Sequence, residues 1–157
     1  MDVKSLEERI KELKEEQKTV CFHTFDEKVA WDIGVRLQKK AAIQHYPISI
    51  RIEACDRILF AASLPGAGPI NDDWARRKGN TARRFNKSSY EMGLYTRLRG
   101  YDLCARYGLE PSEYAASGGA VPIIINGMTI GAITVSGLAE NEDHDLVVST
   151  IHEVFEE

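Results

Sequence analysis

The dipeptide Asn126-Gly127, which lies between two runs of β-branched residues, is the feature that most constrains the fold. Both central residues of a type I′ turn need a positive φ, which Asn tolerates and Gly adopts freely, so this pattern is the strongest short-range indication of a β-hairpin. A two-residue loop fixes the register outward from the turn. It predicts three hydrogen-bonded pairs on one buried face: Ile125 with Met128, Ile123 with Ile130 and Val121 with Ala132.

The opposite face of this hairpin pairs Ile124 with Thr129 and Pro122 with Gly131. Proline is accepted in a strand where its missing N–H faces an edge or the unpaired beginning of the strand. Because proline and glycine side chains are small, this pair leaves a shallow spot. Such a spot suits a closely packed helix, a neighbouring subunit or a flat ligand, and the sequence does not choose among these three.

Hydrophobic periodicity and capping patterns divide the rest of the chain into helices and strands. An amphipathic helix is predicted over residues 2–18, and a second helix follows the capping box that begins at Thr24 and runs to about Ala42. Alternation predicts strands over 48–54 and 58–62, whereas Thr19 to Phe25 fits a short strand or an extended link. Further helices are predicted from Asn71, from Ser88 to about Leu98 and from Asn141, with a short helical or irregular segment over 111–116.

Length and composition indicate a single domain over residues 1–157. A chain of 157 residues with 43% hydrophobic content can bury one full core. No apolar run approaches the roughly 20 residues of a membrane span, and we expect a cytoplasmic protein. The three cysteines, Cys21, Cys55 and Cys104, are far apart and indicate neither a disulfide framework nor a zinc site. Antiparallel pairs joined by short turns argue against a Rossmann fold.

Positive charge is concentrated in one segment of an otherwise acidic chain. Between Arg76 and Arg99 there are eight basic residues and one acid, a local charge of +7, although the whole chain carries −4. This asymmetry implies an anionic ligand at the segment or pairing with the acidic remainder, within one subunit or between subunits. Nucleic acid is disfavoured as a partner because no series of aromatic residues accompanies the basic ones.

The arginines of the helix that begins at Asn71 are the main candidates for ligand binding. Helical spacing brings them together on one surface, because guanidinium groups seven residues apart lie on one side, and Trp74 adds a flat apolar surface nearby. The Gly118-Gly119 pair offers backbone N–H groups to an anion, although simple turn geometry explains it as well. The candidate ligand-binding residues are therefore Trp74, Arg76, Arg77, Arg83, Arg84, Gly118 and Gly119.

The four histidines show no spacing that is typical of a metal site. His144 and His152 are expected to be solvated. His23 is the candidate acid or base if the protein is an enzyme, although a packed strand explains Cys21-Phe22-His23 equally well. The chain has no nucleophile elbow, P-loop or dinucleotide-binding glycine pattern after a strand.

Three motifs resemble the GlcG/HbpS-like family, often described as the haem-degrading domain: 118–123 (GGAVPI), 131–137 (GAITVSG) and 143–147 (DHDLV). Residues 73–81 (DWARRKGNT), followed by Ser88-Ser89, resemble one branch of uncharacterised cytoplasmic proteins. The resemblance implies a profilin-like α/β/α fold with an antiparallel sheet of about five strands. It also implies symmetric homo-oligomers and, through a few family members, haem as a ligand.

Three hypotheses about function follow. The first is an oligomeric cytoplasmic module that binds a small anionic, haem-like ligand through the arginine helix, Trp74 and Gly118-Gly119. The second is a haem-degrading or other small-molecule enzyme, with His23 as acid, base or ligand. The third is an assembly protein whose basic helix docks on acidic neighbours.

Overall fold

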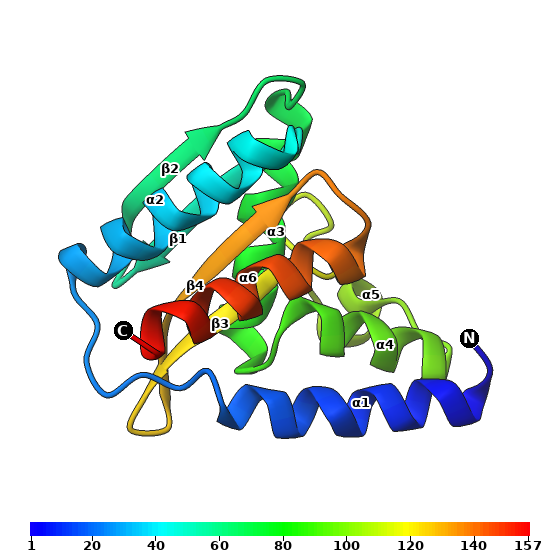
Figure 1. Cartoon of the computed structure of the whole chain (residues 1–157). Helices are drawn as coiled ribbons and strands as arrows, with labels where there is room; N and C mark the ends of the chain where they lie inside the picture. Colours follow the sequence, from blue (N-terminus) through cyan, green and yellow to red (C-terminus); the bar gives the residue numbers. More distant parts are fainter.

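The computed structural model describes residues 1–157 and contains one antiparallel sheet between helices (Figure 1). The sheet has the strand order β2-β1-β4-β3. Helices α2 and α6 cover one face and α3 covers the other, while α1 and α4 lie side by side below. The elements are α1 (Val3–Lys18), α2 (Glu27–Gln44), β1 (Ser49–Ala54), β2 (Arg57–Ser63), α3 (Pro69–Phe85), α4 (Ser89–Arg99), α5 (Leu103–Tyr107), β3 (Ala120–Ile125), β4 (Met128–Ser136) and α6 (Glu140–Phe155).

The predicted three-layer α/β/α arrangement is confirmed, but the sheet has four strands rather than about five. The segment between α1 and α2 accounts for the difference. Its Phe22 forms a single parallel bridge to Ile125, and the Phe22 N–H donates to the Ile124 carbonyl at 2.9 Å. This segment is therefore an extended link that touches the edge strand β3 rather than a fifth strand.

The β3–β4 hairpin turns at Asn126-Gly127 as predicted, but its register changes after two pairs. Ile125 pairs with Met128 and Ile124 with Thr129, and then Ile123 pairs with Gly131, so Ile130 is an extra residue in a β-bulge. The predicted pairs Ile123 with Ile130 and Val121 with Ala132 are therefore wrong. The predicted common buried face is also wrong, because the Met128 side chain is 68% exposed.

Gly131, which directly follows the bulge, lies close to the backbone of the neighbouring strand. A Cβ atom at Gly131 would lie 1.9 Å from the carbonyl oxygen of Glu53 in the neighbouring strand β1. The shallow spot predicted at Pro122 and Gly131 is thus filled on the Gly131 side by the backbone of β1. Pro122 itself pairs with Ala132 and lies on β3, an edge strand, where a missing N–H is tolerated.

The two faces of the sheet differ in the size of their side chains. Large branched residues such as Ile33, Ile133 and Ile151 form the main core under α2 and α6. On the other face a smaller cluster of Ala82, Ala120 and Ala132 lets α3 pack closely. The charged groups of α3 are consequently held near the sheet and the loops around it.

Two helices begin before their predicted first residues. Helix α3 begins at Pro69 with Gly68 as N-cap, and the Asn71 side chain accepts the Gly68 N–H at 2.9 Å from within the first turn. Proline is favoured at the first helical position, which explains the earlier start. Helix α6 begins at Glu140 rather than after Asn141, and the short helix α5 was not predicted.

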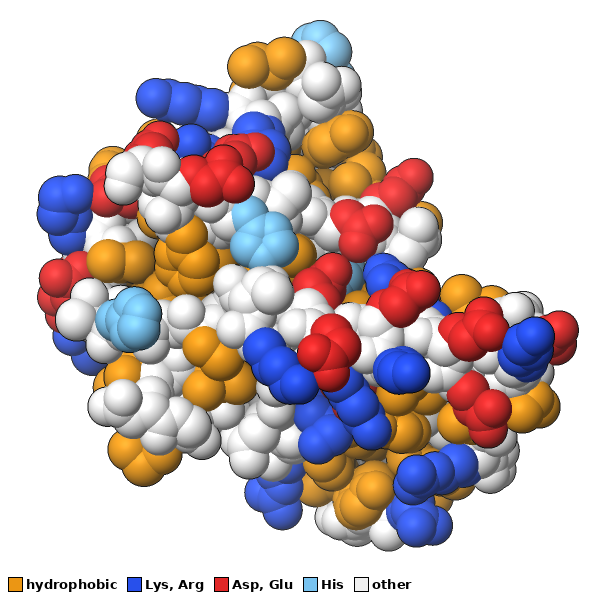
Figure 2. Space-filling model, turned by 60° about the horizontal axis from the view of Figure 1, so that its bottom comes forward, with side chains coloured by type: hydrophobic (Ala, Val, Ile, Leu, Met, Phe, Trp, Pro, Cys, Tyr) orange, Lys and Arg blue, Asp and Glu red, His pale blue; other side chains and the backbone are white.

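Helix α1 forms a separate layer below the sheet. Its Leu6, Ile10 and Leu13 pack with Tyr90 and Leu94 of α4 in a small cluster apart from the main core. In Figure 2, which brings this side forward, acidic and basic side chains are interspersed over the surface. The predicted amphipathic helix is confirmed, and α4 covers its apolar stripe.

No helix in the structure combines the length and the apolar character that crossing a bilayer requires.

Candidate functional site

The carboxyl-terminal half of α3 borders a cavity of about 460 Å³, which we call the arginine cavity. It lies between α3, the β1–β2 turn and the beginning of β4. This volume is within the range of about 300–1,000 Å³ that is typical of small-molecule sites. Its lining residues are Cys55, Asp56, Asn80, Arg83, Arg84, Tyr114, Thr129 and Ile130.

Most of the hydrogen-bond donors in the arginine cavity have no protein acceptor. Arg83 donates one hydrogen bond, from Nη2 to the Asn80 side-chain oxygen at 2.6 Å, whereas the carboxylates of Glu53 and Asp56 lie 3.8 Å away. The Arg83 Nε and the Thr129 hydroxyl are buried without a partner. Arg84 is exposed and forms neither an ion pair nor a hydrogen bond with the protein. The cavity therefore has a surplus of positive charge and of unused donors.

Arg76 lies elsewhere and its charge is neutralised by the protein. Its guanidinium donates to Asp73 at 2.9 Å, to Glu113 at 2.6 Å and to the Ser112 carbonyl at 2.9 Å. Hydrogen bonds to these two carboxylates raise the pKa of Arg76. This arginine attaches α3 to the segment before β3.

Arg77 also belongs to that attachment. Its guanidinium carbon lies 4.6 Å from the centre of the Trp74 ring, and its Nε donates to the Pro111 carbonyl at 3.1 Å. Arg77 and Trp74 line a smaller cavity of about 250 Å³ together with Tyr101 and Cys104. The four arginines do not line one cavity: the returning segment 110–115 engages Arg76 and Arg77, whereas Arg83 and Arg84 line the arginine cavity.

A third cavity, of about 230 Å³, lies at the amino-terminal half of α3, and we call it the lysine cavity. Lys78 is only 3% exposed, and its Nζ donates to Asp143 Oδ2 at 3.0 Å and to the Val135 carbonyl at 3.3 Å. The cavity is lined by Asn71, Trp74, Lys78, Ser117, Ser136, Gly137, Leu138 and Asp143.

The Asp143 carboxylate is surrounded by donors. Besides Lys78, it accepts the backbone N–H groups of Gly137 at 3.3 Å and Leu138 at 3.0 Å. Burial raises the pKa of Asp143, and the charge of Lys78 opposes this shift only in part. Burial likewise lowers the pKa of Lys78, against the attraction of Asp143. Both shifts favour the uncharged forms, because removing charges from water is costly.

Gly118 and Gly119 pass directly over this ion pair. A Cβ atom at Gly119 would lie 2.8 Å from Lys78 Nζ and 2.3 Å from the Val135 carbonyl oxygen, and its φ of +139° suits only glycine. A Cβ atom at Gly118 would lie 2.4 Å from the Glu140 carbonyl oxygen. The two glycines therefore allow close approach of the backbone, and neither lines the arginine cavity.

The Lys78–Asp143 pair was not predicted from the sequence, although the sequence contains a signal for it. Lys78 falls on the same side of its helix as Trp74 and Ala82, and a lysine on an apolar stripe is rarely buried without a partner. Asp143 lies in the first turn of the helix predicted from Asn141, next to His144, which was expected to be solvated. Asp143 is only 1% exposed, because the β4–α6 turn folds over it.

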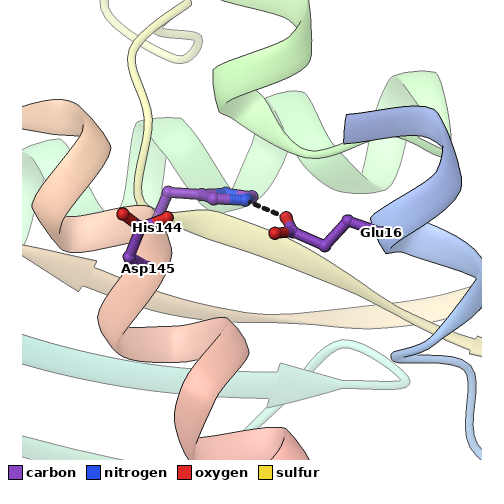
Figure 3. A group of neighbouring side chains, drawn as sticks. All are labelled: Glu16, His144 and Asp145. Carbon is purple, nitrogen blue, oxygen red and sulfur yellow. Dashed lines mark hydrogen bonds and ion pairs between the residues drawn. The ribbon is translucent and has the colours of Figure 1, made fainter. Parts of the chain in front are cut away.

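One of the histidines occupies a place that differs from the prediction. His23 is exposed and lines none of these cavities. His144, which was expected to be solvated, is 2% exposed, and its Nε2 lies 2.5 Å from Glu16 Oε1. Figure 3 shows the His144 ring pointing from α6 toward Glu16 of α1. The prediction for His144 is wrong because α1 covers this end of α6.

Glu16, His144 and Asp145 place three potential ligand atoms within 4.8 Å of one another (Figure 3). Arg9 lies next to this group, with Nη2 3.7 Å from Asp145 Oδ1. Its positive charge disfavours a metal cation. Burial acts to raise the pKa of Glu16, but the hydrogen bond to His144 and the charge of Arg9 lower it overall. The group therefore joins α1 to α6.

The profile of the family described as haem-degrading protein HbpS-like matches residues 25–152, which include the whole sheet and the three cavities described along α3. The chain belongs to this family. Its relatives include a UPF0303 protein of Pseudomonas entomophila, 40% identical over 94% of this chain and 82% of that protein. Another is a UPF0303 protein of Burkholderia thailandensis, 42% identical over 87% of this chain and 83% of that protein.

Solved structures of related proteins agree with the fold. The Ybr137w protein is 30% identical, with a TM-score of 0.82 over 92% of this chain and 86% of its own. A double mutant of Streptomyces reticuli HbpS is 18% identical, with a TM-score of 0.68 over 83% of this chain and 86% of its own. A complex of PduOC with heme has the same identity and TM-score over 78% of this chain and 89% of its own. At 18% identity the last two comparisons concern the fold alone.

The residues of the two α3 cavities do not fit a haem. A haem needs an axial ligand and an apolar pocket for the macrocycle. None of the four histidines lines either cavity; Cys55 and Tyr114, which are of types that can serve as axial ligands, line the arginine cavity, but the lining of that cavity is mostly polar. The lysine cavity is too small for a macrocycle and is lined mainly by polar residues.

Proposed function

We propose that this HbpS-like protein is a binding module for a small anionic ligand that occupies the arginine cavity. The observation that carries the proposal is the set of donors without acceptors: the Arg84 guanidinium, the buried Nε of Arg83 and the buried Thr129 hydroxyl. A buried donor that lacks an acceptor costs about 1–3 kcal/mol, and a bound anion removes this cost. Of the predicted ligand-binding residues, the proposal retains Arg83 and Arg84.

The chemistry of the cavity favours a doubly charged anion with a flat apolar part. Two guanidinium groups match the oxygen atoms of a phosphate monoester, since each presents a planar fork of donors. Tyr114 and Ile130 provide apolar surface beside them. Asp56 is fully exposed at the rim, so solvent screens its negative charge.

Calorimetric titration with inorganic phosphate and phenyl phosphate tests the proposal. We expect phenyl phosphate to bind more tightly, and Arg84→Ala to weaken its binding about 10- to 100-fold, because hydrogen bonds to charged groups contribute about 1.5–3 kcal/mol. Arg57→Ala is the matched control, since it removes an exposed arginine of β2 that lies outside the cavity. Equal losses in both variants, or no binding to the unaltered protein, would contradict the proposal.

Haemin is titrated in parallel, because haem binding or degradation is the alternative suggested by the family. A saturating Soret shift that Arg84→Ala abolishes would identify the anion as haem. Turnover of the bound haem under a reductant would favour the haem-degrading enzyme.

We also propose that the protein acts in the cytoplasm as a homo-oligomer. Several large apolar side chains are exposed, among them Trp31 at 60% and Ile43 at 75%, both on α2; the Trp31 ring packs edge-on against Phe60 and is otherwise largely open to solvent. Single exposed apolar residues are ordinary, but two on one helix beside an open groove support self-association. Native mass spectrometry of the unaltered protein and of Trp31→Glu tests this point. A monomeric mass for the unaltered protein would contradict the proposal.

A further inference from the structure

The lysine cavity has a composition that anion binding does not explain. Lys78 and Asp143 neutralise each other, so the cavity offers little net charge to a ligand. Its walls carry the Ser117 and Ser136 hydroxyls and the Asn71 amide, with only Trp74 and Leu138 as large apolar residues. We propose that Lys78 is a nucleophilic amine that condenses with a small aldehyde or ketone in this cavity, with Asp143 as its acid and base.

The position of the amine supports this chemistry. Nζ lies at the wall of the cavity and uses two of its three donor positions, toward Asp143 and the Val135 carbonyl. The third position has no protein acceptor. The Gly119 backbone lies against Nζ, where a Cβ atom would come within 2.8 Å, so a side chain at this position would obstruct the nitrogen. A carbonyl carbon can therefore approach the nitrogen from the cavity.

The amine must be uncharged when it attacks. Asp143 Oδ2 is 3.0 Å from Nζ and can take its proton in one transfer. Burial favours this transfer, since it lowers the pKa of Lys78 and raises the pKa of Asp143. Surface lysines such as Lys28 have no comparable desolvation and stay protonated at neutral pH.

Each step of the condensation is balanced within the pair. The Nζ lone pair forms a bond to the carbonyl carbon while the carbonyl oxygen takes the proton held by Asp143, which gives a carbinolamine and a carboxylate. Asp143 then accepts a proton from nitrogen and returns it to the hydroxyl group, which leaves as water. The product is a protonated imine beside the Asp143 carboxylate. Its charge equals that of the original ammonium group, so no new buried charge is created.

The size of the cavity limits the substrate to a few heavy atoms. Its volume of about 230 Å³ is below the range for drug-sized ligands. The hydroxyl and amide groups of the walls favour a carbonyl compound with a second polar group. This site is separate from the arginine cavity, and the inference does not depend on the anion proposed there.

Reductive trapping tests the inference. The intact protein is incubated at neutral pH with glyoxylate or acetaldehyde and sodium cyanoborohydride, and the adducts are located by peptide mass mapping. We expect a single adduct at Lys78, formed at least tenfold faster than at Lys28, which is 80% exposed. Lys78→Arg should abolish it, and Lys87→Arg should leave it unchanged.

A second variant keeps the test decisive if Lys78→Arg fails to fold. Asp143→Asn retains the lysine but removes its acid and base, and we expect at least a tenfold slower formation of the Lys78 adduct. Arg84→Ala should not alter trapping, which separates this result from the anion proposal. Adducts distributed over exposed lysines according to their exposure, or no adduct at Lys78, would overturn the inference.

Discussion

The two ends of α3 present positive charge in opposite ways. At the amino-terminal half, Lys78 is buried and paired with a carboxylate that itself accepts two backbone N–H groups. At the carboxyl-terminal half, Arg84 is exposed without a partner and Arg83 has only distant carboxylates. Within one helix, positive charge therefore stabilises the fold at one end and remains available for binding a ligand at the other.

The largest effect is expected for Lys78→Met. This change leaves the Asp143 carboxylate without its partner at 1% exposure, and breaking a buried ion pair costs about 3–5 kcal/mol. Urea unfolding measures the loss. The double variant Lys78→Met/Asp143→Asn should recover part of it, because the amide carries no charge. A loss below about 1 kcal/mol for the single change would show that the pair does not stabilise the fold.

Gly119→Ala should be nearly as harmful. The new methyl group would meet the Val135 carbonyl oxygen and Lys78 Nζ, and its φ of +139° is unfavourable for alanine, so we expect a loss of about 3 kcal/mol in unfolding free energy. Gly100→Ala is the control. Its φ is +68° and no atom lies within 4 Å, which leaves only the backbone cost of about 1 kcal/mol. Equal losses would mean that the close approach at Gly119 is unimportant.

The Glu16–His144 pair is partly buried, so its exposure lies between that of the Lys78–Asp143 pair and that of Arg84. The folded-state pKa of Glu16 is below its ordinary value of 4.5, so the pair contributes stability above about pH 4.5 that is lost as the pH falls through the folded-state pKa. Unfolding free energies measured from pH 7 to pH 3 should show this decline. Glu16→Gln should make this decline smaller, because the amide does not titrate. An unchanged pH profile in the variant would assign the decline to other carboxylates.

The smallest change in stability is expected for Arg84→Ala. Because this side chain contacts no protein partner, the free energy of unfolding should change by less than about 0.5 kcal/mol. The loss of anion affinity predicted above would then be an effect on binding alone. Thermal denaturation without ligand is the measurement. A large destabilisation would show that Arg84 has a structural role that the contacts do not reveal.

Local signals in the sequence predicted the elements well. The Asn126-Gly127 turn depends only on the φ values of two residues, and the Ser88 cap of α4 depends on its own first turn, so both were recognised. The bulge at Ile130 was not recognised, because the turn rule assumes a regular ladder and takes no account of β1, the second strand that pairs with β4. A pairing rule for one hairpin contains no information about the next strand.

The candidate site was predicted less completely for a similar reason. Helical spacing correctly placed the arginines on α3, but which of them are free depends on the segment 110–115, which folds back onto Arg76 and Arg77. The burial of His144 likewise depends on α1, which is 128 residues away in the chain. Contacts between distant segments decided both cases, and a single sequence does not specify them.

Helix α1 lies outside the region that matches the family and has its own small apolar cluster. Three buried side chains and the contact with His144 hold it in place, so it constitutes a cooperative unit that can open without disturbing the sheet. Its amide hydrogens should exchange with solvent sooner than those of β1 and β4. Each such opening would expose the apolar side chains Tyr90 and Leu94, and α4 would then have an apolar surface to which another molecule could bind transiently.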